Sequence, residues 1–259
     1  MGRVIMVASG KGGTGKSMVS ANLGALFAMV GQRVVIVDMD MGLRNVDLYL
    51  GLEEKVLYDA HDVMMGISTI SQALVQDERI PNLWFLGASV SREDGSLTPL
   101  HAEILCEKLK SRFDLVILDA PAGTGDGLVI ASAGAEMAVM VSTPEYASLR
   151  DVGALDKILA EMGILKRGLL LNRVVPDLMK DGIVPSLQEI AGTIDSPLLG
   201  VILEDRNILL STNLGIPIVL KEDTYIFRNF LKIAARIINM LGPENESGNE
   251  ESKNQKQGF

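Results

Sequence analysis

The chain has 259 residues, with 33 acidic against 24 basic side chains and a formal net charge of -9, which argues against a general nucleic-acid-binding surface. Its 47% of hydrophobic residues suffice for one α/β domain, and the single Cys106 excludes an internal disulfide or a cysteine-rich metal site. No signal peptide is visible and no apolar run approaches the ~20 residues that cross a bilayer, so we expect a cytoplasmic protein.

The N-terminal segment has the pattern of a strand, a glycine loop and a helix in succession. Residues 4–8 are apolar, residues 18–30 have helical spacing, and the loop between them is Gly10-Lys11-Gly12-Gly13-Thr14-Gly15-Lys16-Ser17. Glycines let backbone N–H groups approach a polyphosphate closely, and the helix N-terminus adds free donors. We therefore assign all eight residues to nucleotide binding, with Lys16 on the β- and γ-phosphates and the Ser17 hydroxyl on Mg²⁺.

A dinucleotide-binding fold is the alternative for the same glycines. Gly10, Gly12 and Gly15 also satisfy G-x-G-x-x-G, and Asp38 stands about where a ribose-binding acid would. A lysine and a hydroxyl directly after the third glycine are what a triphosphate with magnesium requires, however. The sequence therefore favours ATP and Mg²⁺ as the ligands.

Two carboxylates follow the next predicted strand. Residues 34–37 are apolar and are followed by Asp38-Met39-Asp40, at the edge where open α/β sheets bind ligands. We expect Asp38 to lie near magnesium through a water molecule and Asp40 to orient or activate the attacking water. The alternative for both is the capping of a turn or helix.

The middle of the chain predicts short elements. We expect a loop over the site and a short helix in residues 42–50, helical patches at 58–64 and 69–74, a strand at 83–86 and a helix at 100–110. His61 and His101 have no second histidine or cysteine at metal-ligand spacing, so neither is assigned to a metal.

A third carboxylate ends an apolar strand predicted for residues 113–119. Asp119 has the place of a Walker B aspartate, which holds a magnesium-coordinated water beside Ser17. The following Pro121-Ala122-Gly123 predicts a turn suited to sensing the γ-phosphate.

The second half continues the alternation of strands and helices. We expect strands at 138–141 and 168–171 around a helix at 148–162, and Asn172 would read the adenine edge with its amide, unless it only initiates a turn. The helix predicted for 225–241 has one apolar stripe, which favours packing on the sheet over lying on a membrane surface. Residues 1–241 thus predict a single-domain P-loop NTPase, α/β in class, with a mostly parallel sheet flanked by helices on both faces. We expect residues 242–259 to form a disordered acidic tail.

These motifs resemble a known family. Lys11 beside the loop glycines is similar to the deviant Walker A motif of the MinD/ParA class of P-loop ATPases, and the MinD branch resembles the chain most. Supporting stretches are residues 37–51, 118–123, 143–151 and 200–205, and the likeness extends from residue 3 to about 241.

The resemblance implies a function that the residues alone do not. It implies a slow, partner-stimulated ATPase that forms an ATP-dependent homodimer, in which Lys11, Lys16 and Asp40 are catalytic and Lys11 crosses to the partner's phosphates. The alternative for Lys11 is a solvated loop lysine. The family further implies a division-inhibitor partner for septum placement, an ATPase activator and attachment to the inner face of the cell membrane. The acidic tail, with four Glu against two Lys, lacks the apolar face of a membrane-targeting helix.

Two other functions fit the same motifs. One is a related ATPase for flagellar number control or metalloenzyme maturation. The other is a nucleotide-binding scaffold that no longer hydrolyses ATP, against which Lys11, Lys16, Asp40 and Asp119 argue.

Overall fold

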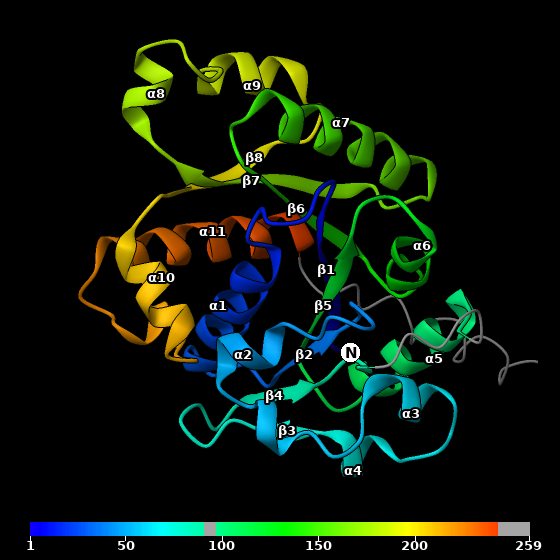
Figure 1. Cartoon of the computed structure of the whole chain (residues 1–259). Helices are drawn as coiled ribbons and strands as arrows, with labels where there is room; N and C mark the ends of the chain where they lie inside the picture. Colours follow the sequence, from blue (N-terminus) through cyan, green and yellow to red (C-terminus); the bar gives the residue numbers. More distant parts are fainter. Residues whose placement is uncertain (91–96, 243–259) are drawn as a thin grey trace, which may run out of the picture.

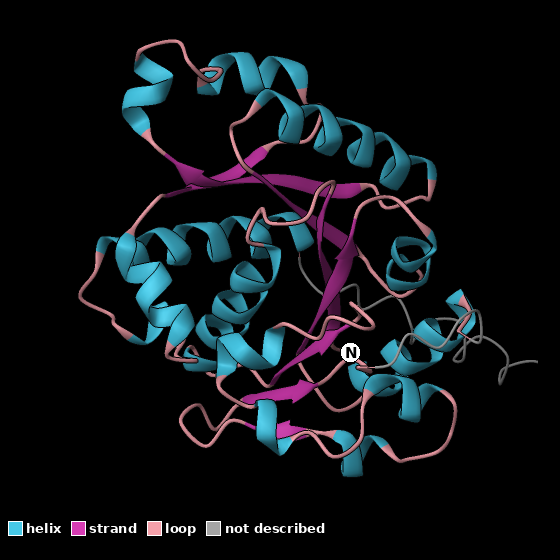
Figure 2. Ribbon diagram, viewed as in Figure 1, coloured by secondary structure: helices cyan, strands magenta, loops and turns pink. Residues whose placement is uncertain are grey.

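The computed structural model describes residues 1–90 and 97–242, which form one eight-stranded sheet with helices on both faces (Figures 1 and 2). The strand order is β3-β4-β2-β5-β1-β6-β7-β8. The strands are β1 (Arg3–Ser9), β2 (Val34–Asp38), β3 (Val75–Gln76), β4 (Leu83–Leu86), β5 (Leu115–Ala122), β6 (Met137–Ser142), β7 (Lys166–Val174) and β8 (Leu198–Leu203). All described pairings are parallel except that of the short edge strand β3 with β4, so the predicted fold class is confirmed.

The helices divide between the two faces of the sheet. They are α1 (Lys16–Met29), α2 (Val46–Leu50), α3 (Ala60–Met64), α4 (Ile70–Ala73), α5 (Pro99–Lys110), α6 (Asp126–Ser132), α7 (Tyr146–Glu161), α8 (Pro176–Lys180), α9 (Leu187–Thr193), α10 (Arg206–Asn213) and α11 (Tyr225–Leu241), with 3₁₀ turns η1 (Glu53–Lys55) and η2 (Ile218–Leu220). One core cluster joins α1, α2 and α11 to the sheet, and a second joins α5, α6, α7 and α9 to the opposite face. Strands covered on both sides are apolar throughout, which explains the unbroken apolar runs in the sequence.

The central strands bring the predicted site residues to one edge. β1 lies between β5 and β6, and β5 lies between β1 and β2. In this register Asp119 of β5 lies opposite Asp38 of β2 on one side and opposite Val7 of β1 on the other. Because parallel strands end at a common edge, the loop after β1 and the carboxylates of β2 and β5 meet there.

The end of β5 and the presence of β3 differ from the sequence prediction. β5 continues to Ala122, so Pro121 and Ala122 belong to the strand and the turn begins at Gly123, which has a φ of 92°. The strand extends because β1 also runs on past a register shift, and Ser9 pairs with Ala122. The antiparallel strand β3 was not predicted, since two residues carry no detectable alternation.

The last helix packs on the sheet, as its apolar stripe predicts. Phe230, Ile233, Ile237 and Leu241 of α11 are buried in the first core cluster. No helix within residues 1–90 and 97–242 is both long and apolar enough to cross a membrane. The tail predicted for residues 242–259 lies, except for Gly242, outside the described residues and stays a prediction.

Phe230→Ala should destabilise the protein by about 3–5 kcal/mol, because it would leave a cavity in a fully buried part of the core. Urea unfolding followed by circular dichroism measures this loss. Ile238→Ala is the matched control on the same helix; its side chain is 38% exposed, and the loss should be below about 1 kcal/mol. Equal losses for the two variants would contradict the packing of α11.

Candidate functional site

The loop between β1 and α1 has the backbone of a phosphate cradle. Gly13 and Gly15 have φ values of 83° and 92°, in the left-handed region that glycine tolerates. A Cβ at Gly13 would meet no atom within 4 Å, so this part of the loop borders open space. A Cβ at Gly15 would lie 2.2 Å from Nδ2 of Asn172, so glycine is required there for packing as well as conformation.

Asp119 accepts hydrogen bonds from three polar side chains in the first turns of α1. Its Oδ2 accepts hydrogen bonds from Lys16 Nζ at 2.6 Å and from Ser17 Oγ at 2.7 Å. Ser20 Oγ donates to Oδ1 of the same carboxylate at 2.5 Å. Ser20 is not among the site residues predicted from the sequence, although its position one turn after Ser17 on the same helix face is the signal that indicates it. All four side chains are buried, so the charges of Lys16 and Asp119 face one another out of water.

The residues at this edge fit a polyphosphate with magnesium. A serine hydroxyl and a carboxylate are oxygen ligands of the kind that Mg²⁺ prefers, and Ser17 and Asp119 lie in direct contact. Ser9 Oγ and Thr14 Oγ1 are buried beside the loop without a hydrogen-bond partner within the described residues. Orphaned buried hydroxyls are rare in native proteins, and here one belongs to the glycine loop and the other directly precedes it.

Asp38 anchors the backbone that follows β2. Its carboxylate accepts hydrogen bonds from the backbone N–H groups of Asp40 at 2.9 Å, Asn45 at 3.0 Å and Val46 at 3.2 Å. Burial, together with the negative charge of Asp119, raises the pKa of Asp38 to about 7. The structure thus shows the turn-capping alternative for Asp38, and its contact with a magnesium-bound water stays a prediction.

Asp40 lies at the start of the same turn and is partly exposed. Its carbonyl accepts from the N–H groups of Leu43 and Arg44, and Arg44 has a φ of 38°, unusual for a residue other than glycine. This tight turn holds Asp40 next to the edge where Asp38 and Asp119 lie.

Asn172, which the sequence predicts to bind adenine, is hydrogen-bonded to the glycine loop. It is buried in β7, and its Nδ2 donates to the Thr14 carbonyl at 2.8 Å. The neighbouring Arg173, which the sequence analysis did not single out, has a φ of 56° and donates from Nη1 to the Gly13 carbonyl at 3.4 Å. Both residues therefore support the glycine loop, while adenine recognition by Asn172 stays a prediction. Lys11 is exposed, which fits both a role at the phosphates of a second protomer and a solvated loop lysine.

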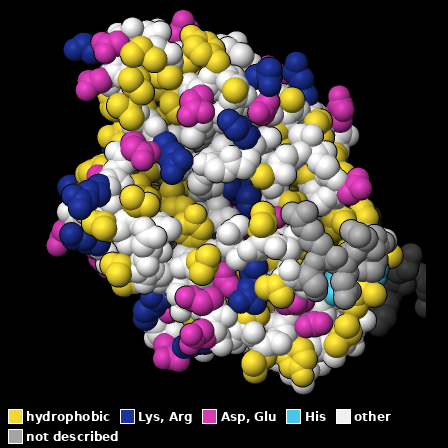
Figure 3. All heavy atoms as spheres, viewed as in Figure 1, with side chains coloured by type: hydrophobic (Ala, Val, Ile, Leu, Met, Phe, Trp, Pro, Cys, Tyr) yellow, Lys and Arg dark blue, Asp and Glu magenta, His cyan; other side chains and the backbone are white. Residues whose placement is uncertain are grey.

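The face of the molecule in Figure 3 carries side chains of both signs, and basic and acidic groups are interspersed over it. Leu43, in the turn after Asp40, and Leu48, in α2, are 59% and 51% exposed. Apolar side chains thus reach the surface close to the proposed site.

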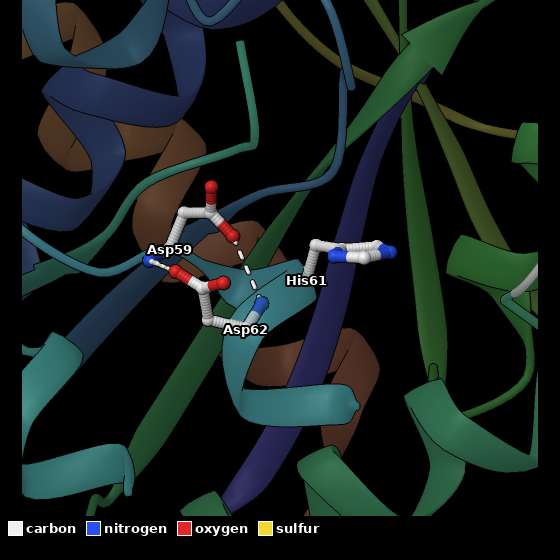
Figure 4. Close-up of side chains that lie close together, drawn as sticks. All are labelled: Asp59, His61 and Asp62. Atoms are coloured by element: carbon white, nitrogen blue, oxygen red, sulfur yellow. Dashed lines mark hydrogen bonds between the residues drawn. The ribbon is translucent and has the colours of Figure 1, made fainter. Parts of the chain in front are cut away.

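A second cluster of possible metal ligands has a simpler explanation. One ligand atom each from Asp59, His61 and Asp62 lies within 4.8 Å of the others. Asp59 and Asp62 exchange hydrogen bonds with each other's backbone N–H and so form the capping box of α3 (Figure 4). Helix capping accounts for both carboxylates.

Known proteins share this arrangement over nearly the whole chain. The ParA family model, described as NUBPL iron-transfer P-loop NTPase, matches residues 1–238. The septum site-determining protein MinD of Synechocystis sp. is 41% identical over 86% of this chain and 84% of its own length. The protein of the same name from Helicobacter pylori is 40% identical over 92% of this chain and 91% of its own. The chain belongs to the MinD family of P-loop NTPases.

Solved MinD structures agree with this assignment. The MinC:MinD cell division protein complex of Aquifex aeolicus matches with a TM-score of 0.85 and 33% identity, over 92% of this chain and 96% of that chain. MinD complexed with Mg-ADP from Pyrococcus horikoshii matches with a TM-score of 0.83 and 31% identity, over 93% of this chain and 98% of the other. The resemblance to MinD is thereby confirmed, and the dinucleotide fold is excluded.

Proposed function

We propose that the protein is a Mg-ATP-dependent ATPase switch of the MinD type, which helps to place the division septum through a partner inhibitor. The observation that carries this proposal is the buried cluster of Lys16, Ser17 and Asp119 beneath an open glycine loop. The septum-site-determining relatives at about 41% identity supply its biological setting.

The loop residues hold the nucleotide in this proposal. Backbone N–H groups of residues 10–17 and the Lys16 ammonium bind the β- and γ-phosphates. In the structure Lys16 and Ser17 both donate to Asp119. On nucleotide binding the Lys16 ammonium would turn from this carboxylate to the phosphates, whereas the Ser17 hydroxyl can keep donating to Asp119 while its lone pair binds Mg²⁺. Asn172 supports the loop through Thr14 and would meet the base with its remaining amide groups.

Ser17 and Asp119 are the residues that would hold Mg²⁺, with Asp38 supporting them from the second strand. The ion would supply charge neutralisation for the phosphate oxygens. Asp40 orients the attacking water and accepts its proton, from a turn that Asp38 fixes through three backbone N–H groups.

Lys11 completes the site of a second copy of the chain. Its side chain is exposed, so it is accessible to another protomer. A cation that stabilises transition-state charge in trans makes hydrolysis depend on dimerisation. ATP would then control whether the protein is a monomer or a homodimer.

The partners follow from the relatives. The Aquifex aeolicus MinD is known in complex with MinC, and a division inhibitor of that kind is the partner that we propose for this chain. An activator protein that speeds the slow ATPase is the second. We propose a cytoplasmic location without assigning direct membrane attachment, because the tail sequence is acidic and has no apolar face.

A role in metalloenzyme maturation is the second candidate, favoured by the iron-transfer description of the matching family model. Transfer of an iron–sulfur cluster uses accessible thiolates. The one cysteine, Cys106, is buried, and burial raises the pKa of its thiol to about 12. The septum-placement function therefore fits this chain better than cluster transfer does. No specific feature of the described residues favours flagellar number control.

ATP turnover distinguishes the switch from a scaffold that only binds nucleotide. Wild-type protein should hydrolyse ATP in the presence of Mg²⁺, and Asp40→Asn should lower kcat by roughly 10²-fold or more while retaining nucleotide affinity. Phosphate release measures kcat, and equilibrium binding of a fluorescent ATP analogue measures affinity. Equal turnover by wild type and variant, with and without lipid or partner protein, would contradict the proposal that the protein is an ATPase.

A further inference from the structure

Arg79, in the turn between β3 and β4, joins three segments through one guanidinium. Its Nε donates to Oδ1 of Asp77 at 3.0 Å and its Nη2 donates to Oδ2 at 2.7 Å. The Asp77 carboxylate is only 1% exposed, and its Oδ1 also accepts from the Arg79 backbone N–H at 2.8 Å. A bidentate pair of this kind fixes the plane of the guanidinium as well as its position.

The outer side of the same guanidinium binds two distant backbone carbonyls. Nη1 donates to the carbonyl of Gly215 at 2.9 Å, and Nη2 donates to that of Leu50. Leu50 is the last residue of α2, whereas Gly215 follows α10. Arg79 thus joins the end of one segment to the end of another, more than one hundred residues later.

The two segments also touch directly beneath Arg79. A Cβ at Gly51 would lie 2.9 Å from the Gly215 carbonyl oxygen, and a Cβ at Gly215 would lie 2.7 Å from Cα of Gly51. Both glycines have positive φ, at 60° and 61°. The two backbones approach so closely that neither position has room for a side chain. Glycine is therefore required at both residues of this contact.

The α2 segment connects this contact to the proposed catalytic residue. Its beginning is held by Asp38, which accepts from the N–H groups of Asp40 and Val46. Its middle is held by Arg44, which pairs with the buried Asp47 at 2.5 Å and donates to the Glu53 carbonyl at 3.0 Å. Residues 40–53 therefore form one braced unit with Asp40 at one end and the Arg79 contact near the other, and α2 lies beside α10 (Figure 1).

We propose that Arg79 is a positioning residue, which fixes the Asp40-bearing segment and couples it to the loop after α10. The inference rests on the proposed ATPase function and on the role of Asp40 in it. An aspartate that orients water needs a fixed position, since a displacement of about 1 Å at a catalytic group costs on the order of 10²-fold in rate. Arg79 touches neither the phosphate loop nor Asp119, so it should affect the rate more than nucleotide binding.

The test compares the double variant Asp77→Asn/Arg79→Gln with wild type, so that no buried carboxylate is left unpaired. We expect a kcat about 10-fold lower or more, with affinity for a non-hydrolysed ATP analogue changed less than about 2-fold. Hydrogen exchange should become faster in residues 42–52 and in residues 206–216 together, because one contact holds both. Arg79→Lys keeps the charge but lacks the planar fork, so its kcat should be intermediate.

Lys55→Gln is the matched control. Lys55 pairs with Glu78, the neighbour of Arg79, at 2.8 Å on an exposed surface, and its loss should change neither kcat nor the exchange of these peptides. A double variant with wild-type kcat, or with faster exchange in only one of the two segments, would overturn the positioning role. A wild-type protein without turnover would instead overturn the proposed function, and the paired exchange response would still reveal the contact.

Discussion

Lys16→Met should abolish useful ATP binding, with an affinity loss of about 10²–10³-fold. The ammonium is the one cation in contact with Asp119 in the described structure, and in the proposed function it binds the phosphates. Truncating one partner of a desolvated charge pair typically costs about 2–5 kcal/mol in binding. Equilibrium titration with a fluorescent ATP analogue measures the loss, and Lys108→Met, a lysine exposed on α5 away from the loop, is the control.

The same variant should also be less stable without nucleotide, for a separate reason. Asp119 and Asp38 are both fully buried and lie opposite one another in register, with Lys16 beside them. Removing the cation leaves an uncompensated buried charge, which costs about 3–5 kcal/mol. The double variant Lys16→Met/Asp119→Asn should recover most of this stability in urea unfolding while ATP binding stays lost. Recovery of binding in the double variant would show that Lys16 acts through folding rather than on the phosphates.

The sequence was most informative where one residue type is physically required. The glycine loop, the apolar strands and the carboxylates at their ends follow from conformational freedom, burial and strand direction, so Gly15, Asp38 and Asp119 could be placed at one edge before any coordinates. The register Asp38 opposite Asp119 then follows from parallel pairing of adjacent strands. The α11 stripe predicts packing for the same kind of reason.

The remaining features depend on contacts between segments that no local pattern specifies. The amide of Asn172 could bind a nucleotide base or initiate a turn, and the sequence does not distinguish the two. Only the fold shows that this amide donates to the Thr14 carbonyl. Arg79 would pass as a solvated charge in a polar turn, since nothing in its neighbourhood indicates that Leu50 and Gly215 end beside it. Asp38 illustrates a third case, in which one carboxylate fits both metal and capping chemistry and the structure shows the capping contacts.

Lys11→Ala should leave ATP binding by the monomer near wild type and lower kcat by about 10³-fold or more. Lys11 is exposed, whereas Lys16 is buried in contact with Asp119, so we propose separate tasks for the two lysines of this motif. Cations supplied in trans to transferring phosphoryl groups contribute about 10³–10⁵ to kcat. Light scattering with a non-hydrolysed ATP analogue should show dimers for wild type and monomers for Lys11→Ala. A variant that dimerises normally and hydrolyses ATP at the wild-type rate would exclude this role.

Mixing two inactive variants decides whether Lys11 acts across the dimer. In a mixed dimer of Lys11→Ala and Asp40→Ala protomers, the Lys11→Ala protomer keeps its own Asp40 and would receive Lys11 from its partner. One site of that dimer is then complete, so mixing the two variants should raise turnover well above that of either variant alone. A lysine that served its own protomer would restore nothing, because each site would still lack one of the two residues. Restored turnover would therefore assign Lys11 to the partner's phosphates and make the glycine loop half of a shared site.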